Sequence, residues 1–213
     1  MKSKYAGRNV FVYRKSAFTS PLDMLQHKIH GWDVQAHITY EFNDYGFRGV
    51  FNPNLDMCIG DSRTFGWGVE NENSYPYLLQ CNNFGVSGCG WQTFLRLAKE
   101  WLEDYHPKNI YLLDTWLSRR EIELNGEYFQ VSSTGQRKED NMIYKLPDFD
   151  ENENEPIKNN SLLQIQSLCA DKGINLVYID MQDFLPTDGK AHDGVHPGIK
   201  WHRDIAKEFK KRC

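Results

Sequence analysis

The chain has 213 residues, of which 40% are hydrophobic and 25% charged, and its formal net charge is −4. This length and apolar content suit one domain with a full core rather than two domains. The acidic balance argues against a general nucleic-acid binder, because such binding requires a basic field that replaces the counterions of the phosphates.

The sequence carries few signals of membrane insertion, export or disulfide formation. No apolar run approaches the roughly 20 residues that span a bilayer, and Met1 to Lys4 does not lead into the apolar core of a signal peptide. Five cysteines without C-x-x-C spacing predict neither a disulfide framework nor a zinc site. We therefore expect a cytoplasmic protein with no membrane partner, no metal and no cofactor.

Residues 1–54 form a lead-in, and residues 55–213 form the main domain on which we expect it to pack. Within the lead-in, Ala36 to Phe42 alternates and is rich in β-formers, which predicts one strand or an extended arm. Turn-forming residues then fill Asn43 to Gly49, and Pro53 and Asn54 predict a second turn before the first core strand.

A short apolar run ends abruptly within Met57 to Val69, which reads M-C-I-G-D-S-R-T-F-G-W-G-V. About five apolar residues are enough for a buried parallel strand, and Gly60 can take a turn geometry that a side chain would resist. Asp61 is expected to cap the segment that follows. Ser62 would then lie at the carboxyl edge of the sheet, where ligands bind in open α/β folds. The tripeptide Gly-Asp-Ser alone is more often an ordinary turn, so further support is needed.

Strands and helices alternate in the next stretch. Ser74 to Leu79 predicts a short helix with a serine cap and a proline in its first turn. Asn83 to Val86 predicts a brief strand that breaks into the glycine-rich turn Ser87 to Gly90. Trp91 to Tyr105 has apolar residues at helical spacing, and Asn109 to Asp114 is a second buried strand. This strand-helix-strand unit predicts a parallel sheet.

The pattern loosens from Glu121 to Pro156, with a hairpin predicted around Leu124 to Glu127 because Asn-Gly favours a tight turn. The acidic loop Asp148 to Glu155 lacks the spacing of a calcium loop. Beyond it, periodicity predicts a helix, a last buried strand and a terminal helix, over Ile157 to Lys172, Ile174 to Asp180 and Gly198 to Lys211.

A second chemical stretch lies between the last strand and the last helix, and it contains Asp193 and His196 three residues apart. One loop can present both side chains to the same point, with the carboxylate on one imidazole nitrogen and the other nitrogen facing Ser62. A serine hydroxyl needs such a base at neutral pH. His192 and His196 also form an H-x-x-x-H pair, but Gly194 between them argues against the helix that zinc binding would need.

These motifs together resemble the SGNH, or GDSL-type, hydrolases over roughly residues 41–212. The resemblance implies a three-layer α/β/α sandwich with a mainly parallel central sheet, of the flavodoxin-like type. It also implies that Ser62 is the nucleophile, His196 the base and Asp193 its orienting partner. By the same resemblance, the backbone N–H groups of Gly88 and of Ser62 itself bind the oxyanion.

One part of the family pattern is missing. The third block of the family ends a strand with Gly-x-Asn-Asp, whereas this chain continues after the matching strand with Asp114 to Arg120 and has no asparagine there. Losing one oxyanion donor costs on the order of 100- to 1000-fold in rate. Substitutes within the block are Thr115, Trp116, Ser118 and Arg119. Arginine at this edge could instead recognise an anionic substrate, so we name Arg63, Trp116 and Arg119 as candidate substrate-binding residues.

The leading hypothesis is a serine hydrolase that cleaves an acetyl or other short acyl ester through an acyl-enzyme on Ser62, with an ester on a carbohydrate as the first specific candidate. An acyltransferase of the same fold is the near rival, because the aromatic-rich region around Trp67, Trp91 and Trp116 could exclude water or stack sugars. A catalytically impaired binding module is the rival from another class. The oligomeric state is left open.

Overall fold

The structure, a computed structural model, describes residues 38, 40–132, 136–138, 141–145, 150–185, 189–191 and 195–213. Its centre is a sheet of four strands in the order β2-β1-β3-β8, and every neighbouring pair is parallel. Its strands are β1 (Asp56–Gly60), β2 (Cys81–Gly85), β3 (Asn109–Leu113) and β8 (Asn175–Ile179). The predicted parallel α/β architecture is confirmed.

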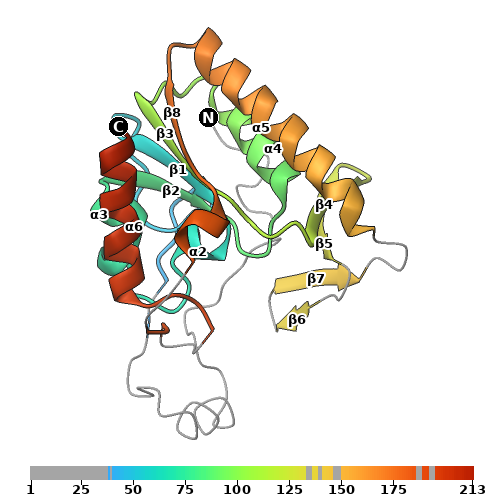
Figure 1. Cartoon of the computed structure of the whole chain (residues 1–213), viewed down its shortest axis with the longest axis horizontal. Helices are drawn as coiled ribbons and strands as arrows, with labels where there is room; N and C mark the ends of the chain where they lie inside the picture. Colours follow the sequence, from blue (N-terminus) through green and yellow to red (C-terminus); the bar gives the residue numbers. More distant parts are fainter. Residues whose placement is uncertain are drawn as a thin grey trace, which may run out of the picture.

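Helices cover both faces of this sheet (Figure 1). Met57 and Ile59 of β1 pack in one core with α4 (Trp91–Trp101) and α5 (Asn154–Asp171). Cys58 points to the opposite face, because successive side chains of a strand alternate between its two faces. There it belongs to a second core, which includes buried side chains of α3 and α6. These two helices span Tyr75–Leu78 and Ile199–Arg212. The arrangement is compatible with a three-layer sandwich.

The other sheet also has four strands, in the order β4-β5-β7-β6, and it lies to one side of the parallel sheet (Figure 1). The predicted hairpin is confirmed, because β4 and β5 pair antiparallel around Asn125 and Gly126, both with positive φ. The extension of this hairpin by β7 and β6 was not predicted. Its strands are β4 (Arg119–Leu124), β5 (Glu127–Ser132), β6 (Gln136–Lys138) and β7 (Asn141–Lys145).

Two details of the predicted helices are wrong. The helix expected to reach Tyr105 ends at Trp101, because the chain turns there and the Tyr105 hydroxyl bonds to Asn82 at the edge strand. Ser74 occupies the N-cap position of α3 but does not cap it, since its hydroxyl donates to the Asn71 carbonyl at 2.6 Å.

The described part of the lead-in packs beside the segment that follows Ser62. Ile38 and Tyr40 form a small core with Phe65, and the Tyr40 ring stacks on that of Trp67 at 4.9 Å. Phe42 pairs antiparallel with Arg48 across the predicted turn. Residues 36, 37 and 39 of the predicted strand, and all of residues 1–35, lie outside the described residues. None of the described helices is long and apolar enough to cross a bilayer.

Candidate active site

The candidate site lies at the carboxyl edge of the parallel sheet. The chain runs from β1 to β2 on one side and then returns to β3 on the other side of β1. Ligands of open α/β sheets bind at such a reversal, outside the carboxyl ends of the two strands that flank it. Ser62 follows the carboxyl end of β1, and the segment from Asp114 follows that of β3.

Ser62 is the first residue of α2 (Ser62–Phe65), and 4% of its surface is exposed. The turn into this helix requires glycine, because a Cβ on Gly60 would lie 1.8 Å from the Thr64 hydroxyl. A Cβ on Gly85, at the end of β2, would lie 2.1 Å from the backbone nitrogen of Phe65. Two strand-terminal glycines therefore let α2 pack directly on the ends of β1 and β2.

Two backbone donors at this edge have no partner among the described residues. The N–H of Ser62 is at the start of a helix, where no intrahelical acceptor exists, and it donates to no other described group. The same holds for the N–H of Gly88, in the turn between β2 and α4, where a positive φ of 76° favours glycine. Donors of this kind can stabilise an oxyanion.

Asp61 caps α2 as predicted, accepting a hydrogen bond from the Arg63 backbone N–H at 2.9 Å. Its carboxylate also accepts from the Arg63 guanidinium at 3.0 and 3.1 Å and from Nη1 of Arg119 at 3.2 Å. Burial alone would raise the pKa of Asp61, but the two arginines and these hydrogen bonds outweigh burial and lower the pKa to about 2. A fully buried, ionised carboxylate thus lies immediately before Ser62.

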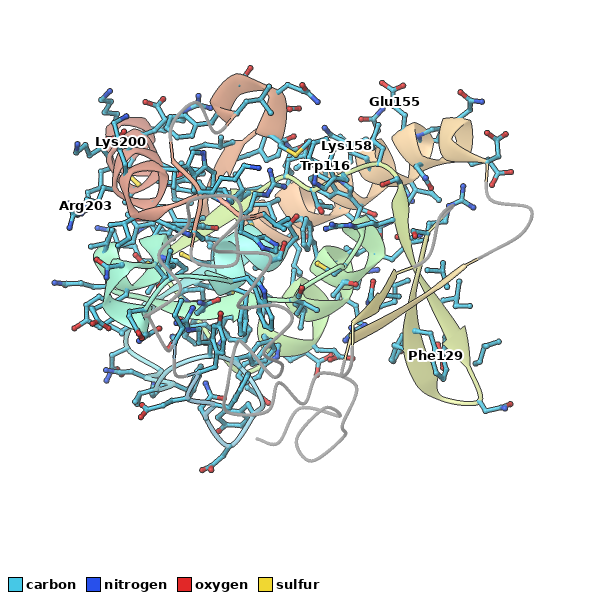
Figure 2. The ribbon with its side chains drawn as sticks, turned by 90° about the horizontal axis from the view of Figure 1, so that it is seen from below. Trp116, Phe129, Glu155, Lys158, Lys200 and Arg203 are labelled. Atoms are coloured by element: carbon cyan, nitrogen blue, oxygen red, sulfur yellow. The ribbon has the colours of Figure 1, made fainter. Side chains whose placement is uncertain are left out.

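The segment after β3 contains the candidate substitutes for the missing asparagine. Thr115 does not qualify, because its hydroxyl donates to Asp61 at 3.1 Å and approaches the Cys89 carbonyl at 3.3 Å. Trp116 is 47% exposed and faces the Arg63 guanidinium at 5.9 Å from the ring centroid; it carries a label in Figure 2. Arg119 joins the site through its ion pair with Asp61.

Of the predicted base and its orienting partner, only His196 lies within the described residues. His196 lies in the segment that leads into α6, and its carbonyl accepts from the Ala191 N–H at 2.8 Å. Its imidazole is close enough to contribute to the electrostatics of His202. No hydrogen bond joins the Ser62 and His196 side chains within the described part of the chain. Asp193 lies outside the described residues.

His202, in α6, is fully buried. Its Nδ1 accepts the Tyr75 backbone N–H at 3.2 Å, which ties α6 to α3. Burial, followed by the charges of Arg48 and His196, lowers the pKa of His202 to about 3. This imidazole is therefore neutral at physiological pH and has a structural role.

A second polar cluster lies at the same sheet edge, and it was not predicted from the sequence. The Asp114 carboxylate accepts from the Trp91 indole at 2.9 Å, from Lys158 and from the Tyr178 hydroxyl at 3.2 Å. Lys158, labelled on α5 in Figure 2, also binds Asp180 at 3.0 Å. A signal was available, because Asp114 and Asp180 each follow a buried strand directly.

Within the described ranges, no group of three or more histidine, cysteine, aspartate or glutamate side chains is placed to hold a metal ion. No protein-family model matches the chain, and no curated protein sequence matches it.

Proposed function

We propose that the protein is a serine hydrolase of the SGNH type that cleaves an ester through an acyl-enzyme on Ser62. One observation carries this proposal: a serine begins a helix at the carboxyl-edge reversal point of a parallel sheet, where its own N–H and that of Gly88, in the turn after the adjacent strand β2, bond to no described residue. A nucleophile and donors for the charge that develops during its attack are the two parts that acyl transfer needs first.

In this proposal, Ser62 Oγ attacks the ester carbonyl carbon while His196 takes the hydroxyl proton. The bond between the carbonyl carbon and the alcohol oxygen then breaks, and the alcohol leaves with that proton. Water repeats both steps on the acyl-enzyme, so that the acid is released and the Ser62 hydroxyl is restored. Asp193 would hold the imidazole in the tautomer that accepts the proton.

The backbone N–H groups of Ser62 and Gly88 would bind the oxyanion in the tetrahedral intermediates. Both donors belong to turns that strand-terminal or left-handed glycines shape, so they are held in place before the substrate arrives. Preorganised donors of this kind stabilise the transition state without reorganisation. We propose a short acyl ester as the substrate, with an acetyl ester on a carbohydrate as the first candidate because the exposed Trp116 ring could stack on a sugar.

The test combines a fluorophosphonate probe with p-nitrophenyl acetate. We expect the native protein to be labelled and to hydrolyse the ester, and Ser62→Ala to lose the label and at least about 1000-fold in kcat. Ser87→Ala is the matched control, since it removes a hydroxyl from the neighbouring turn and should retain the label. Activity should also rise between pH 5 and 8, because a histidine base must be unprotonated to act.

Three results would contradict this assignment. A label that survives Ser62→Ala would mean that another residue is the nucleophile. A flat pH profile would count against a histidine base. A native protein that neither labels nor turns over would favour a site that binds without cleaving.

A further inference from the structure

Two arginines share a single carboxylate beside Ser62. Asp61 is fully buried, and the side chains of Arg63 and Arg119 are only 7% and 16% exposed. Neither arginine forms an ion pair with any other carboxylate in the described part of the chain. Buried charges are costly unless they are paired, so this arrangement leaves one guanidinium charge without a local counterion.

The nearest cluster of acids does not supply that counterion. Asp114 contributes only its backbone carbonyl to Arg63, at 2.7 Å. Its carboxylate is occupied by Trp91, Lys158, Tyr178 and the N–H of the next residue. The carboxylates of Asp61 and Asp114 therefore bind different partners, although both lie at the same sheet edge.

Three guanidinium nitrogens of these two arginines form no hydrogen bond to a described residue. Arg63 uses Nε and Nη2, whereas its Nη1 has no hydrogen-bond partner among the described residues. Arg119 uses Nη1 on Asp61, and its Nε and Nη2 make no hydrogen bond to a described residue. None of these three nitrogens is among the fully enclosed, unpartnered polar atoms of the described residues, so none is completely sealed from solvent. The planar fork of a guanidinium matches a carboxylate in geometry.

The exposed Trp116 ring gives this position an apolar side. It lies within cation–π range of Arg63, at 5.9 Å from the guanidinium carbon to the ring centroid. Asp61 holds both guanidiniums and is adjacent in sequence to Ser62, so an anion bound there would be close to the candidate nucleophile.

We propose that Arg63 and Arg119 bind a carboxylate carried by the substrate, so that the preferred ester is an anionic one. This inference rests on the proposed function, because it concerns the substrate of the same site. Asp61 is a positioning residue in this scheme, since it holds the two guanidiniums and does not touch the substrate.

The test compares two esters with the same leaving group and acyl length, mono-p-nitrophenyl succinate and p-nitrophenyl butyrate. We expect the succinate hemiester to have a kcat/KM at least about tenfold higher, as hydrogen bonds to charged groups warrant. A carboxylate on the alcohol part is tested in parallel by p-acetoxybenzoate against phenyl acetate. The preference should fall about tenfold in Arg119→Gln and be partly restored in Arg119→Lys, which keeps the charge but loses the fork.

Arg120→Gln is the matched control, because the Arg120 side chain binds Glu153 and Asn154 and not Asp61. It should leave the preference unchanged. Absence of a preference for either anionic ester in the native protein would overturn the proposal. Equal losses on the anionic and neutral esters in Arg119→Gln would also overturn it, and would assign Arg119 to the oxyanion instead.

A binding measurement separates this inference from the proposed function. Ser62→Ala protein is titrated calorimetrically with monomethyl succinate and with methyl butyrate. We expect heat of binding for the hemiester alone, and its loss when Arg119→Gln is added. If no ester is hydrolysed and no label forms, the proposed function fails, while this titration still decides whether the arginines bind a carboxylate. No binding of the hemiester overturns the inference.

Discussion

Asp61→Asn is the substitution that most directly probes the centre of the site. It keeps the size of the side chain and the cap on α2, but it removes the charge that two guanidiniums share. Because Arg63 and Arg119 would then be enclosed without a carboxylate, both would lose a partner in a region with little access to water. The folded state should therefore be destabilised far more than by loss of a surface ion pair.

The magnitude follows from the burial and from the pKa of Asp61. Breaking a buried ion pair by removing one partner costs about 3 to 5 kcal/mol. Separately, a fall in pKa from 3.8 to about 2 means that ionised Asp61 contributes about 2 kcal/mol at neutral pH. The first figure is larger because it includes the cost of two unpaired arginines. The lowered pKa makes the stabilisation complete above about pH 4 and progressively lost as the pH falls toward 2.

Urea denaturation followed by circular dichroism measures the effect. At pH 7 we expect the free energy of unfolding of Asp61→Asn to be about 3 kcal/mol below that of the native protein, and this gap should narrow by about 1 kcal/mol at pH 3. Asp204→Asn is the control, because Asp204 pairs with Lys200 and Lys207 on the exposed side of α6 and should change little. A gap below about 1 kcal/mol at pH 7, or one that does not depend on pH, would refute the reasoning.

Two further predictions concern the packing that places Ser62. Gly85→Ala should lower the free energy of unfolding by about 2 kcal/mol or more, because its Cβ would lie 2.1 Å from the backbone nitrogen of Phe65; an unchanged urea midpoint would show that α2 is not seated on β2. Arg48→Met should cost about 3 kcal/mol in the same assay, because the buried guanidinium donates to the carbonyls of Phe65, Gly66 and Val69. Arg203→Met, on the exposed side of α6 (Figure 2), is its control, and equal effects of the two substitutions would contradict the role of Arg48.

The parallel sheet was predictable from short-range pattern. Strands β1, β3 and β8 are brief runs of mostly apolar residues that end in glycine or are followed directly by aspartate, and α4, a helix with one apolar face, separates β2 from β3. The hairpin was predictable for a local reason as well, because Asn125 and Gly126 readily adopt the positive φ that a tight turn requires.

The burial of the charged residues in this hairpin was not predictable in this way. Strand β4 reads R-R-E-I-E-L, in which only Ile122 and Leu124 are apolar. Its Glu121 is nevertheless buried, and it accepts hydrogen bonds from Arg96, Thr93 and Gln130 at 2.6 to 2.9 Å. A glutamate whose burial depends on partners from other elements looks like a surface residue in the sequence.

The candidate site likewise combines features that follow from local sequence with features that depend on tertiary contacts. The place of Ser62 after a strand and the cap formed by Asp61 depend on contacts within a few residues, and both follow from local sequence. The pairing of Asp61 with Arg119 joins residues 58 positions apart, and it depends on β3 lying beside β1. Local pattern thus determined the strand, the turn and the candidate nucleophile, whereas the charge environment of that serine depends on the tertiary packing that brings Arg119, the first residue of β4, to the same edge.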